Sequence, residues 1–400
     1  MLYDQIADRW LISQFTLPGG AAATQCIAIS ETPDPTGSYF QYEFPTPGND
    51  YPKLSVWTDG FDQSSYLAGI RNFSGGFNFD AYAFQRDSML VGRNAAAVVF
   101  NLSALVPGAN NFLPADIEGP TAAPFGTPGV FLGMDNPSVP QDELEMLELE
   151  VDWVTPANST LTRLPDVAVA QFDGNVCFFS RNCIPQPNTN TGVDGFADAM
   201  MFRLPYRNFG GSQSLVCTHT VDVGDFSDHA GIRWHELTNA GAGNGAWALN
   251  QEGTYAPDSD HRWMPSISIN QNGDIMVGYS VSSNTTFPSI RYAGRLAADP
   301  LNQLTFAEGL IVAGSGSQSS MRWGDYHDMS VDPSDDLTFW YTAQYQSGAG
   351  NAKNTRIAAI AANTAPPLVD ITVTPSVAVP VIVPSGGLIF DMTITVDNNG

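Results

Sequence analysis

A two-strand unit recurs along the chain, and this repeat constrains the fold more than any other feature. In each copy an apolar strand enters a turn of Asp, Asn or Gly, and a second strand rich in aromatic residues follows. The clearest copies cover residues 53–67, 266–280 and 329–342, and others begin near residues 2, 130 and 214. Strand repeats of this size, marked by glycine and aromatic residues, indicate a β-propeller.

A second, looser hairpin with a proline in its turn follows several copies, at residues 26–44, 148–164 and 291–310. Two hairpins make one four-stranded sheet, so we expect six blades, with a seventh if residues before Met1 add one. Tandem β-sandwich domains are the alternative. Such domains need about seven strands per ~100 residues, which fits the hairpin repeat less well.

Helical periodicity is nearly absent, so the chain is predicted to be all-β. Even the stretch most like a helix, residues 141–151, alternates acidic and apolar residues with a period of two. After residue 360 the composition shifts to a linker rich in Ala and Pro, followed by renewed alternation. We expect a propeller at 1–363, and at 364–400 a linker and the truncated start of an immunoglobulin-like β module.

The charge balance excludes one large class of partners. There are 41 acidic and 16 basic side chains, giving a formal net charge of −25, whereas a nucleic-acid site needs a basic face. No run of 18 apolar residues occurs, so no membrane-spanning helix is expected. A monomer without nucleic-acid or membrane-spanning function is predicted.

Four cysteines bear on the cellular compartment. Cys177 and Cys183 flank a short loop whose spacing suits a local disulfide, with a pair of buried thiols as the alternative. Cys26 and Cys217 could pair only if the fold joins distant segments. The N-terminus looks truncated and shows no signal peptide, so that absence does not oppose export, and a secreted or cell-surface location is expected.

Arg-Trp dipeptides are the most unusual local feature, and they occur at 9–10, 233–234, 262–263 and 322–323. In a structural interpretation each Trp packs between blades and each Arg pairs with a nearby Asp. In a functional interpretation the guanidinium groups converge on the central axis, where they would hold a carboxylate. The candidate ligand-binding residues are His261, Arg262, Trp263, Arg291, Arg322, Trp323, Asp325 and Tyr326.

Acidic turns offer a weaker metal site. Asp222, Asp225 and Asp228 are spaced three apart, and calcium binds carboxylate oxygens in such loops. The spacing does not match an EF-hand, so solvated turns are the alternative. Structural calcium is the only cofactor considered, and otherwise none is expected.

Several segments resemble large secreted bacterial β-propeller proteins of uncharacterised function. The resemblance rests on DRWLISQF, YPKLSVW, TYAPDSDHRWMPSISIN, GYSVSSNTTFPSIRYAGR and RWGDYHDMSVDPSDDLTFWYT, and covers residues 1 to 360. That group is distantly similar to sialidase-like propellers with Asp-box (BNR) repeats. The resemblance implies export and a propeller fold. The turn at 268–273 departs from the Asp-box pattern, with Asn270 at the Asp position and one extra residue.

Three functions are compatible with these observations. The leading hypothesis is a non-enzymatic propeller that binds a glycan or a surface protein within a larger multidomain secreted protein. The alternative is a sialidase-like glycoside hydrolase acting on acidic sugars, which requires three converging arginines and a Tyr beside a carboxylate. The third is a structural spacer with a filled channel. No complete catalytic motif is present, so enzymatic activity is left open.

Overall fold

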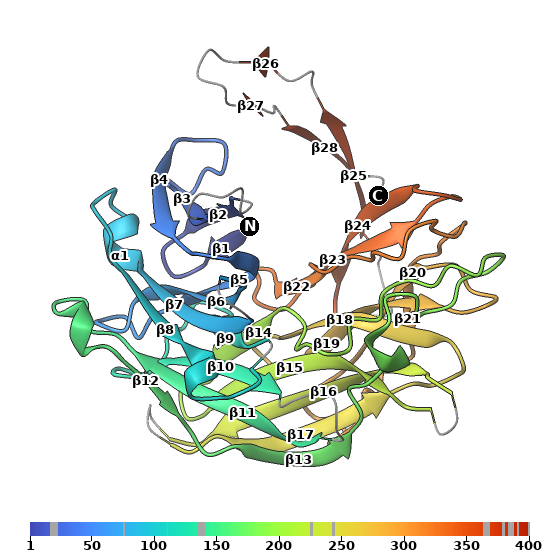
Figure 1. The fold of residues 1–400 in the computed structure, drawn as a ribbon, viewed down its shortest axis with the longest axis horizontal. Helices are drawn as coiled ribbons and strands as arrows, with labels where there is room; N and C mark the ends of the chain where they lie inside the picture. The colour runs from blue at the N-terminus through green and yellow to red at the C-terminus, as the bar shows by residue number, and fades with distance from the viewer. Residues whose placement is uncertain are drawn as a thin grey trace.

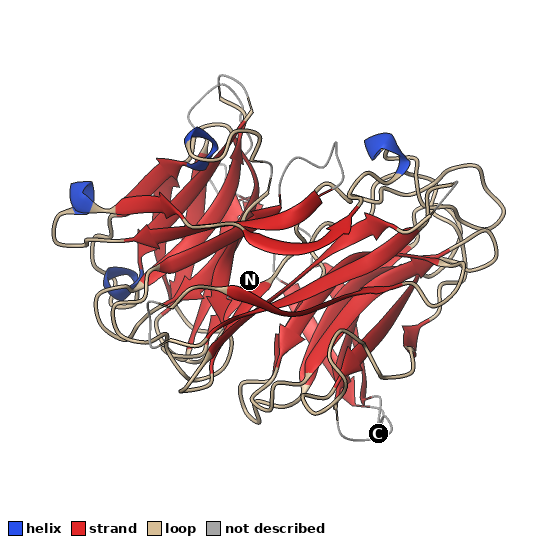
Figure 2. Ribbon diagram, turned by 90° about the horizontal axis from the view of Figure 1, so that it is seen from below, coloured by secondary structure: helices blue, strands red, loops and turns tan. Residues whose placement is uncertain are grey.

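A computed structural model shows a β-propeller whose sheets stand around a common axis (Figure 1). The structure describes residues 1–16, 23–74, 77–109, 111–134, 141–224, 227–241 and 245–362, together with four strands beyond residue 362. The few helical turns lie at the edges of the molecule, and strands fill its interior (Figure 2). These turns are α1 (Arg86–Met89), η1 (Leu102–Ala104), η2 (Pro156–Asn158) and η3 (Cys177–Phe179).

Four sheets are antiparallel units in which sequence order equals spatial order. The first contains β1 (Leu2–Asp4), β2 (Arg9–Phe15), β3 (Thr24–Ser30) and β4 (Tyr39–Pro45). The second contains β5 (Asn49–Trp57), β6 (Ser65–Asn72), β7 (Asn78–Gln85) and β8 (Ala97–Asn101). Another contains β18 (His261–Ile269), β19 (Ile275–Ser282), β20 (Ser289–Arg295) and β21 (Gly309–Val312). The last begins with β22 (Asp328–Val331), β23 (Phe339–Gln346) and β24 (Lys353–Ile360).

Between the second sheet and β18 lies one nine-stranded sheet made of two units. Its first unit holds β9 (Leu113–Ile117), β10 (Gly129–Met134), β11 (Gln141–Glu150), β12 (Thr160–Arg163) and β13 (Val167–Phe172). Its second unit holds β14 (Leu204–Asn208), β15 (Gln213–Asp222), β16 (Ala230–Asn239) and β17 (Ala248–Tyr255). The units join where β9 pairs with β14 in parallel. Because hydrogen bonding merges two units, the number of blades stays a prediction.

The predicted hairpins are confirmed, and two of them occupy a different place in their sheet from the one expected. The hairpins β1–β2, β5–β6, β18–β19 and β22–β23 open their sheets as predicted. The hairpins β10–β11 and β15–β16 are instead preceded by β9 and β14, which the repeat did not reveal. Those two short strands are the ones nearest the axis in their units (Figure 1).

The segment beyond residue 362 adds β25 (Val369–Val377), β26 (Val381–Ile382), β27 (Leu388–Ile389) and β28 (Met392–Asn398). β25 pairs antiparallel with β24, so it extends the last sheet, and β28 pairs with β25. Residues 363–368, 378–380, 383–387, 390–391 and 399–400 lie outside the described part of the chain. The domain boundary at 363 and the immunoglobulin-like module therefore stay predictions.

The core consists of apolar strand faces packed between neighbouring sheets. One cluster lies between the first two sheets, and a larger one joins the second sheet to the nine-stranded sheet. Further clusters lie between β15–β16 and β18–β20, and between β19–β20 and β22–β24. In the part of the chain that the structure describes, no helix is long and apolar enough to span a membrane.

Candidate functional site

Two cavities border both the first and the last sheet, and the first of them also borders β5 of the second sheet. Both are bordered by Leu2 of β1 and Asp328 of β22. The first cavity, of about 360 Å³, lies at the end where β22 begins. The second cavity, of about 400 Å³, lies at the end where β22 finishes. Because first strands line the axis of a propeller, both cavities lie next to that axis.

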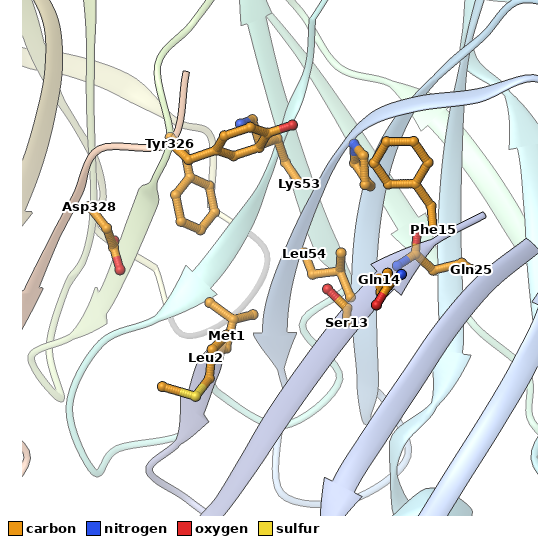
Figure 3. Close-up of a pocket in the computed structure, with 12 residues that line it drawn as sticks. Met1, Leu2, Ser13, Gln14, Phe15, Gln25, Lys53, Leu54, Tyr326 and Asp328 are labelled. Carbon is orange, nitrogen blue, oxygen red and sulfur yellow. The ribbon is translucent and has the colours of Figure 1, made fainter. Parts of the chain in front are cut away.

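The first cavity brings together side chains from β2, β3, β5 and the segment before β22. Lys53 and Tyr326 lie on one side of it, and Phe15, Gln14 and Gln25 lie on the other (Figure 3). Its remaining neighbours are Met1, Leu2, Ser13, Pro52, Leu54, Phe202 and Asp328. Amides, a hydroxyl, a cation and aromatic rings therefore border one space.

Lys53 is the buried cation of the first cavity, with only 2% of its surface exposed. Its ammonium nitrogen lies 3.6 Å from the Tyr51 ring centroid and 3.9 Å from that of Tyr326, and it donates a hydrogen bond to the main-chain oxygen of Asp325 at 3.3 Å. Burial holds the pKa of Lys53 well below its ordinary value. Ring faces attract a cation, so the two tyrosines stabilise its charged form.

Tyr326 is an exposed aromatic residue that borders this cavity. Its residue is 57% exposed, although its hydroxyl sits in a partly buried position, and burial together with Asp325 raises the pKa of Tyr326 to about 12. The hydroxyl is therefore neutral and able to donate at ordinary pH. The ring packs on Tyr51, with centroids 5.4 Å apart.

Gln25 contributes a hydrogen-bond donor that no described residue accepts. The residue is fully buried and borders the first cavity. Asn49 donates from Nδ2 to Gln25 Oε1 at 3.0 Å, which orients the Gln25 amide and leaves Nε2 without a partner among the described residues. Buried donors are nearly always satisfied, so the buried Nε2 marks a position where an enclosed water would accept.

A charged cluster centred on Arg203 lies beside the second cavity. Arg203 donates from Nε to Asp116 at 2.7 Å and from a terminal nitrogen to Glu118 at 3.0 Å. Burial raises the pKa of Asp116 to about 6 even though Arg203 opposes that shift. Ser268 also donates to Glu118, at 2.8 Å. The hydrogen bonds of this cluster are internal, so it supports the wall of that cavity.

Asp328 differs from those carboxylates because its side chain is 35% exposed and borders both cavities. Burial raises its pKa above the ordinary value, while Arg203, with Nε 3.9 Å from Asp328 Oδ1, opposes that rise. Within the described chain Oδ1 has no hydrogen-bond donor. Asp328 is therefore a partly exposed carboxyl group that borders both cavities.

The predicted site residues divide into separate groups. Arg262 and Arg291 both bind Glu308, at 2.7 Å each, and Arg262 also pairs with Asp258 at 2.8 Å. Arg262 is fully buried, so its charge is compensated inside the protein. His261 lies beside His229, and burial together with that neighbour lowers the pKa of His261 to about 4.

Trp263 and Trp323 pack against each other in the core, with ring centroids 5.7 Å apart. They are 0% and 2% exposed, and Trp323 donates to Ser280 Oγ at 2.9 Å. The segment between β13 and β14 covers them with apolar side chains. Their rings are therefore packing residues and offer no surface to a ligand, in agreement with the structural interpretation of the Arg-Trp pairs.

Of the predicted site residues, Tyr326 borders the first cavity. Arg322 and Asp325 lie close to it in the same segment before β22. Arg322 is 48% exposed and pairs with Asp325 at 2.7 Å, and with Asp194 at 3.8 Å. Arg181 lies 3.6 Å from the same Asp194. Since Arg262 and Arg291 are bound to Glu308 and Arg322 to aspartates, the three arginines do not converge on one open carboxylate site.

The predicted disulfide between Cys177 and Cys183 is present, with an S–S distance of 2.12 Å. Cys26 and Cys217 are free, on β3 and β15. Asp225 lies outside the described residues. Asp222 accepts main-chain hydrogen bonds from Gly224 and His229, and Asp228 accepts one from Cys177. No group of metal-binding residues occurs among the described residues, and structural calcium stays a prediction.

Sequence reasoning missed Lys53 and Gln25. Lys53 carries a visible signal, because it is one of two lysines in the chain and interrupts an apolar strand, YPKLSVW. A lysine in a buried strand is rare unless it has a specific role. Gln25 has no such signal, since its burial depends on the packing of β3 against β5.

The structure is a β-propeller with cavities next to its axis. No protein-family model and no curated protein matches the sequence. Among solved structures, an α-L-arabinanase of Penicillium chrysogenum complexed with arabinobiose is 13% identical, with a TM-score of 0.43 over 82% of each chain. Extracellular domains 1–2 of Drosophila semaphorin 1b are 8% identical, with a TM-score of 0.32 over 99% of this chain and 87% of that one. At these scores the likenesses carry no weight for function.

Proposed function

We propose that this chain is an extracellular glycan-binding β-propeller domain of a larger protein, and that the first cavity is its binding site. The observation that carries the proposal is the exposed ring of Tyr326 at a cavity that the polar side chains of Ser13 and Gln14 also border. Sugars present hydroxyl oxygens that accept hydrogen bonds and C–H faces that pack on aromatic rings. The disulfide supports an oxidising compartment.

The surrounding groups fit a polyhydroxylated ligand. Gln14 and Ser13 add further donors and acceptors at the cavity, and Lys53 adds positive charge behind Tyr326. A cavity of about 360 Å³ falls in the range of small-ligand sites and holds one or two sugar units.

The test is binding to an array of neutral and uronic-acid oligosaccharides, followed by calorimetry with the best ligand. Tyr326→Ala is expected to weaken binding about tenfold, the loss of one good stacking contact. Tyr326→Phe retains the ring and should bind nearly as wild type. Phe125→Ala is the matched control, because Phe125 is 72% exposed and does not border the cavity. Absence of any glycan ligand, or full binding by Tyr326→Ala, would overturn the proposal.

Glycoside hydrolysis is a second candidate, favoured by one observation. The raised pKa of Asp328 suits a proton donor, and this carboxyl reaches the first cavity. Release of reducing ends from a bound glycan, lost in Asp328→Asn, would support hydrolysis. Binding without release would leave the domain a glycan-binding module.

A further inference from the structure

The disulfide between Cys177 and Cys183 closes a loop whose backbone is in an unfavourable conformation. Cys177, Phe178 and Phe179 have φ angles of 54°, 51° and 59°, so three consecutive residues lie in the left-handed region. None of them is glycine, and in this region the Cβ atom comes too close to the following carbonyl oxygen. The closed loop is therefore strained, and other bonds must hold it in place.

The side chains of the loop compensate little for this strain. Phe178 is 85% exposed and Phe179 is 42% exposed, so their rings bury little apolar surface. The side chain of Arg181 is 59% exposed, and its Nε lies 3.6 Å from Asp194 Oδ2. An ion pair so open to water contributes little to stability. The disulfide is therefore the main constraint on the middle of the loop.

Two hydrogen bonds join the ends of the loop to the rest of the protein. The main-chain N–H of Cys177 donates to Asp228 at 2.5 Å, and that of Gly192 donates to Asn182 Oδ1 at 2.5 Å. Both bonds lie next to a cysteine and leave residues 178–181 between them. They hold the ends of the loop, whereas the strained residues lie at or beyond the first end.

The chain on either side of the loop is fixed independently of the disulfide. Val176 and Ile184 are 3% and 0% exposed and belong to the apolar cluster around the buried tryptophans. Ile184 also exchanges two main-chain hydrogen bonds with Val193, at 2.8 and 2.9 Å. Cys177 and Cys183 themselves are half-buried, as attack by a thiol requires. Cleavage of the disulfide would thus free the loop and leave its attachment points in place.

The loop is connected through one carboxylate to the segment that carries Tyr326. Asp194 lies 3.6 Å from Arg181 and 3.8 Å from Arg322. Its main-chain N–H donates to the oxygen of Met321 at 2.7 Å. The state of the loop therefore determines whether Arg181 shares Asp194 with Arg322, close to the first cavity.

We propose that residues 177–183 form a redox-sensitive loop, which a dithiol opens while the rest of the propeller stays folded. A thiolate of the dithiol attacks one sulfur of the disulfide and forms a mixed disulfide, and the other cysteine leaves as a thiolate that takes up a proton. The second thiol then displaces the first cysteine, so the products are two cysteine thiols and a cyclic disulfide. The released backbone returns to ordinary φ angles, and Arg181 leaves Asp194. Glycan binding is not required for any of these steps.

Trypsin measures the opening, because Arg181 is a cleavage site inside the loop. The closed loop should resist cleavage although the Arg181 side chain is exposed, since a protease requires a chain that can extend. After treatment of the whole chain with dithiothreitol, the Arg181–Asn182 bond should be cut at least tenfold faster. Cleavage at the exposed Arg93 is the internal control and should not change.

A double variant separates opening of the loop from other effects of the reductant. Cys177→Ser combined with Cys183→Ser should be cut at Arg181 as fast as the reduced wild type, without any dithiothreitol. Thermal unfolding should stay cooperative in both samples. Equal cleavage rates in the oxidised, reduced and double-variant proteins, or loss of the whole fold on reduction, would overturn the proposal.

A glycine substitution tests the role of strain. Phe178→Gly removes the side-chain clash at a left-handed residue, so it stabilises the closed loop. The ratio of reduced to oxidised dithiothreitol at half-reduction, read by mass after alkylation, should rise about fivefold. Ser180→Gly is the matched control and should not raise that ratio, because Ser180 has an ordinary φ of −69°. The same ratio in Phe178→Gly as in the wild type would contradict the proposed strain.

Discussion

Lys53 and Tyr326, 273 positions apart in the chain, are in contact at the first cavity, with the ammonium nitrogen 3.9 Å from the ring centroid. Among the described residues, no carboxylate forms an ion pair with this buried ammonium. It donates its hydrogen bond to the main-chain oxygen of Asp325. The two tyrosine rings return only part of the hydration that burial removes. Lys53 therefore lowers the stability of the fold in return for a charge at the cavity.

Replacing Lys53 by Met should raise the free energy of unfolding at pH 7 by about 1 kcal/mol. The pKa of Lys53 is lower in the folded than in the unfolded chain, where it is about 10.4. Between these values the unfolded state binds more protons, so the wild type gains stability as pH rises and the difference should shrink near pH 10.

Urea unfolding at pH 7 and pH 10 measures this effect. Lys353→Met is the matched control, because the other lysine is exposed and should change stability by less than about 0.5 kcal/mol. A Lys53→Met protein less stable than wild type at pH 7 would show that the two rings outweigh the lost hydration.

Trp263 and Trp323 should be essential to stability, because both rings are buried against each other beneath the segment between β13 and β14. Truncation of either to Ala leaves a large cavity and is expected to cost about 3–5 kcal/mol in urea unfolding. Phe125→Ala, on the exposed surface, should stay within about 0.5 kcal/mol of wild type. Losses below 1 kcal/mol for both tryptophans would contradict their packing role.

His327 should make the fold sensitive to acid. Burial lowers its pKa to about 4. Its Nε2 accepts the main-chain N–H of Gln344 at 3.2 Å, and its Nδ1 lies 3.0 Å from the Met264 oxygen, so protonation of Nε2 would break a hydrogen bond.

The direction in which stability changes with pH follows from the pKa of His327 in the folded and unfolded chains. The unfolded imidazole titrates near 6.5, so from pH 6.5 down to about 4 the unfolded chain binds the proton first and stability falls, by up to about 3 kcal/mol. Unfolding measured at pH 7, 6 and 5 should show a smaller slope for His327→Gln than for wild type. Identical slopes would indicate that His327 is not the responsible group.

Arg203 should be the most sensitive charged residue beside the second cavity. Arg203→Met leaves Asp116 and Glu118 buried without their cation, which is expected to cost about 3–5 kcal/mol. Removing the guanidinium should also raise the pKa of Asp116 further above 6, so the loss should be greater at pH 8 than at pH 5. Arg93→Met, at an exposed position, is the control. A loss independent of pH would contradict the electrostatic explanation.

Local sequence signals predicted much of the fold. Turn residues between apolar runs identified the hairpins, and β11 was recognised as a strand from its period of two. The six-residue separation of Cys177 and Cys183 identified the disulfide. Each of these features depends on residues close together in the chain, which is why the sequence alone was sufficient.

Other features depend on contacts that leave no local trace. β9 and β14 were missed because each is five residues long and carries proline at its second position, a residue typical of loops and strand edges. Alternation along β18 sends Arg262 towards Glu308 and Trp263 towards Trp323, so adjacent residues of one motif serve different environments. Lys53 meets the Asp325 carbonyl 272 residues away.

The parallel pairing of β9 with β14 gives the ring of sheets a mechanical asymmetry. Separating those two units requires the rupture of main-chain hydrogen bonds, whereas the other sheets are separate hydrogen-bonded units that pack through side chains. The β9–β14 boundary should therefore be the last boundary between neighbouring sheets to open when the protein unfolds.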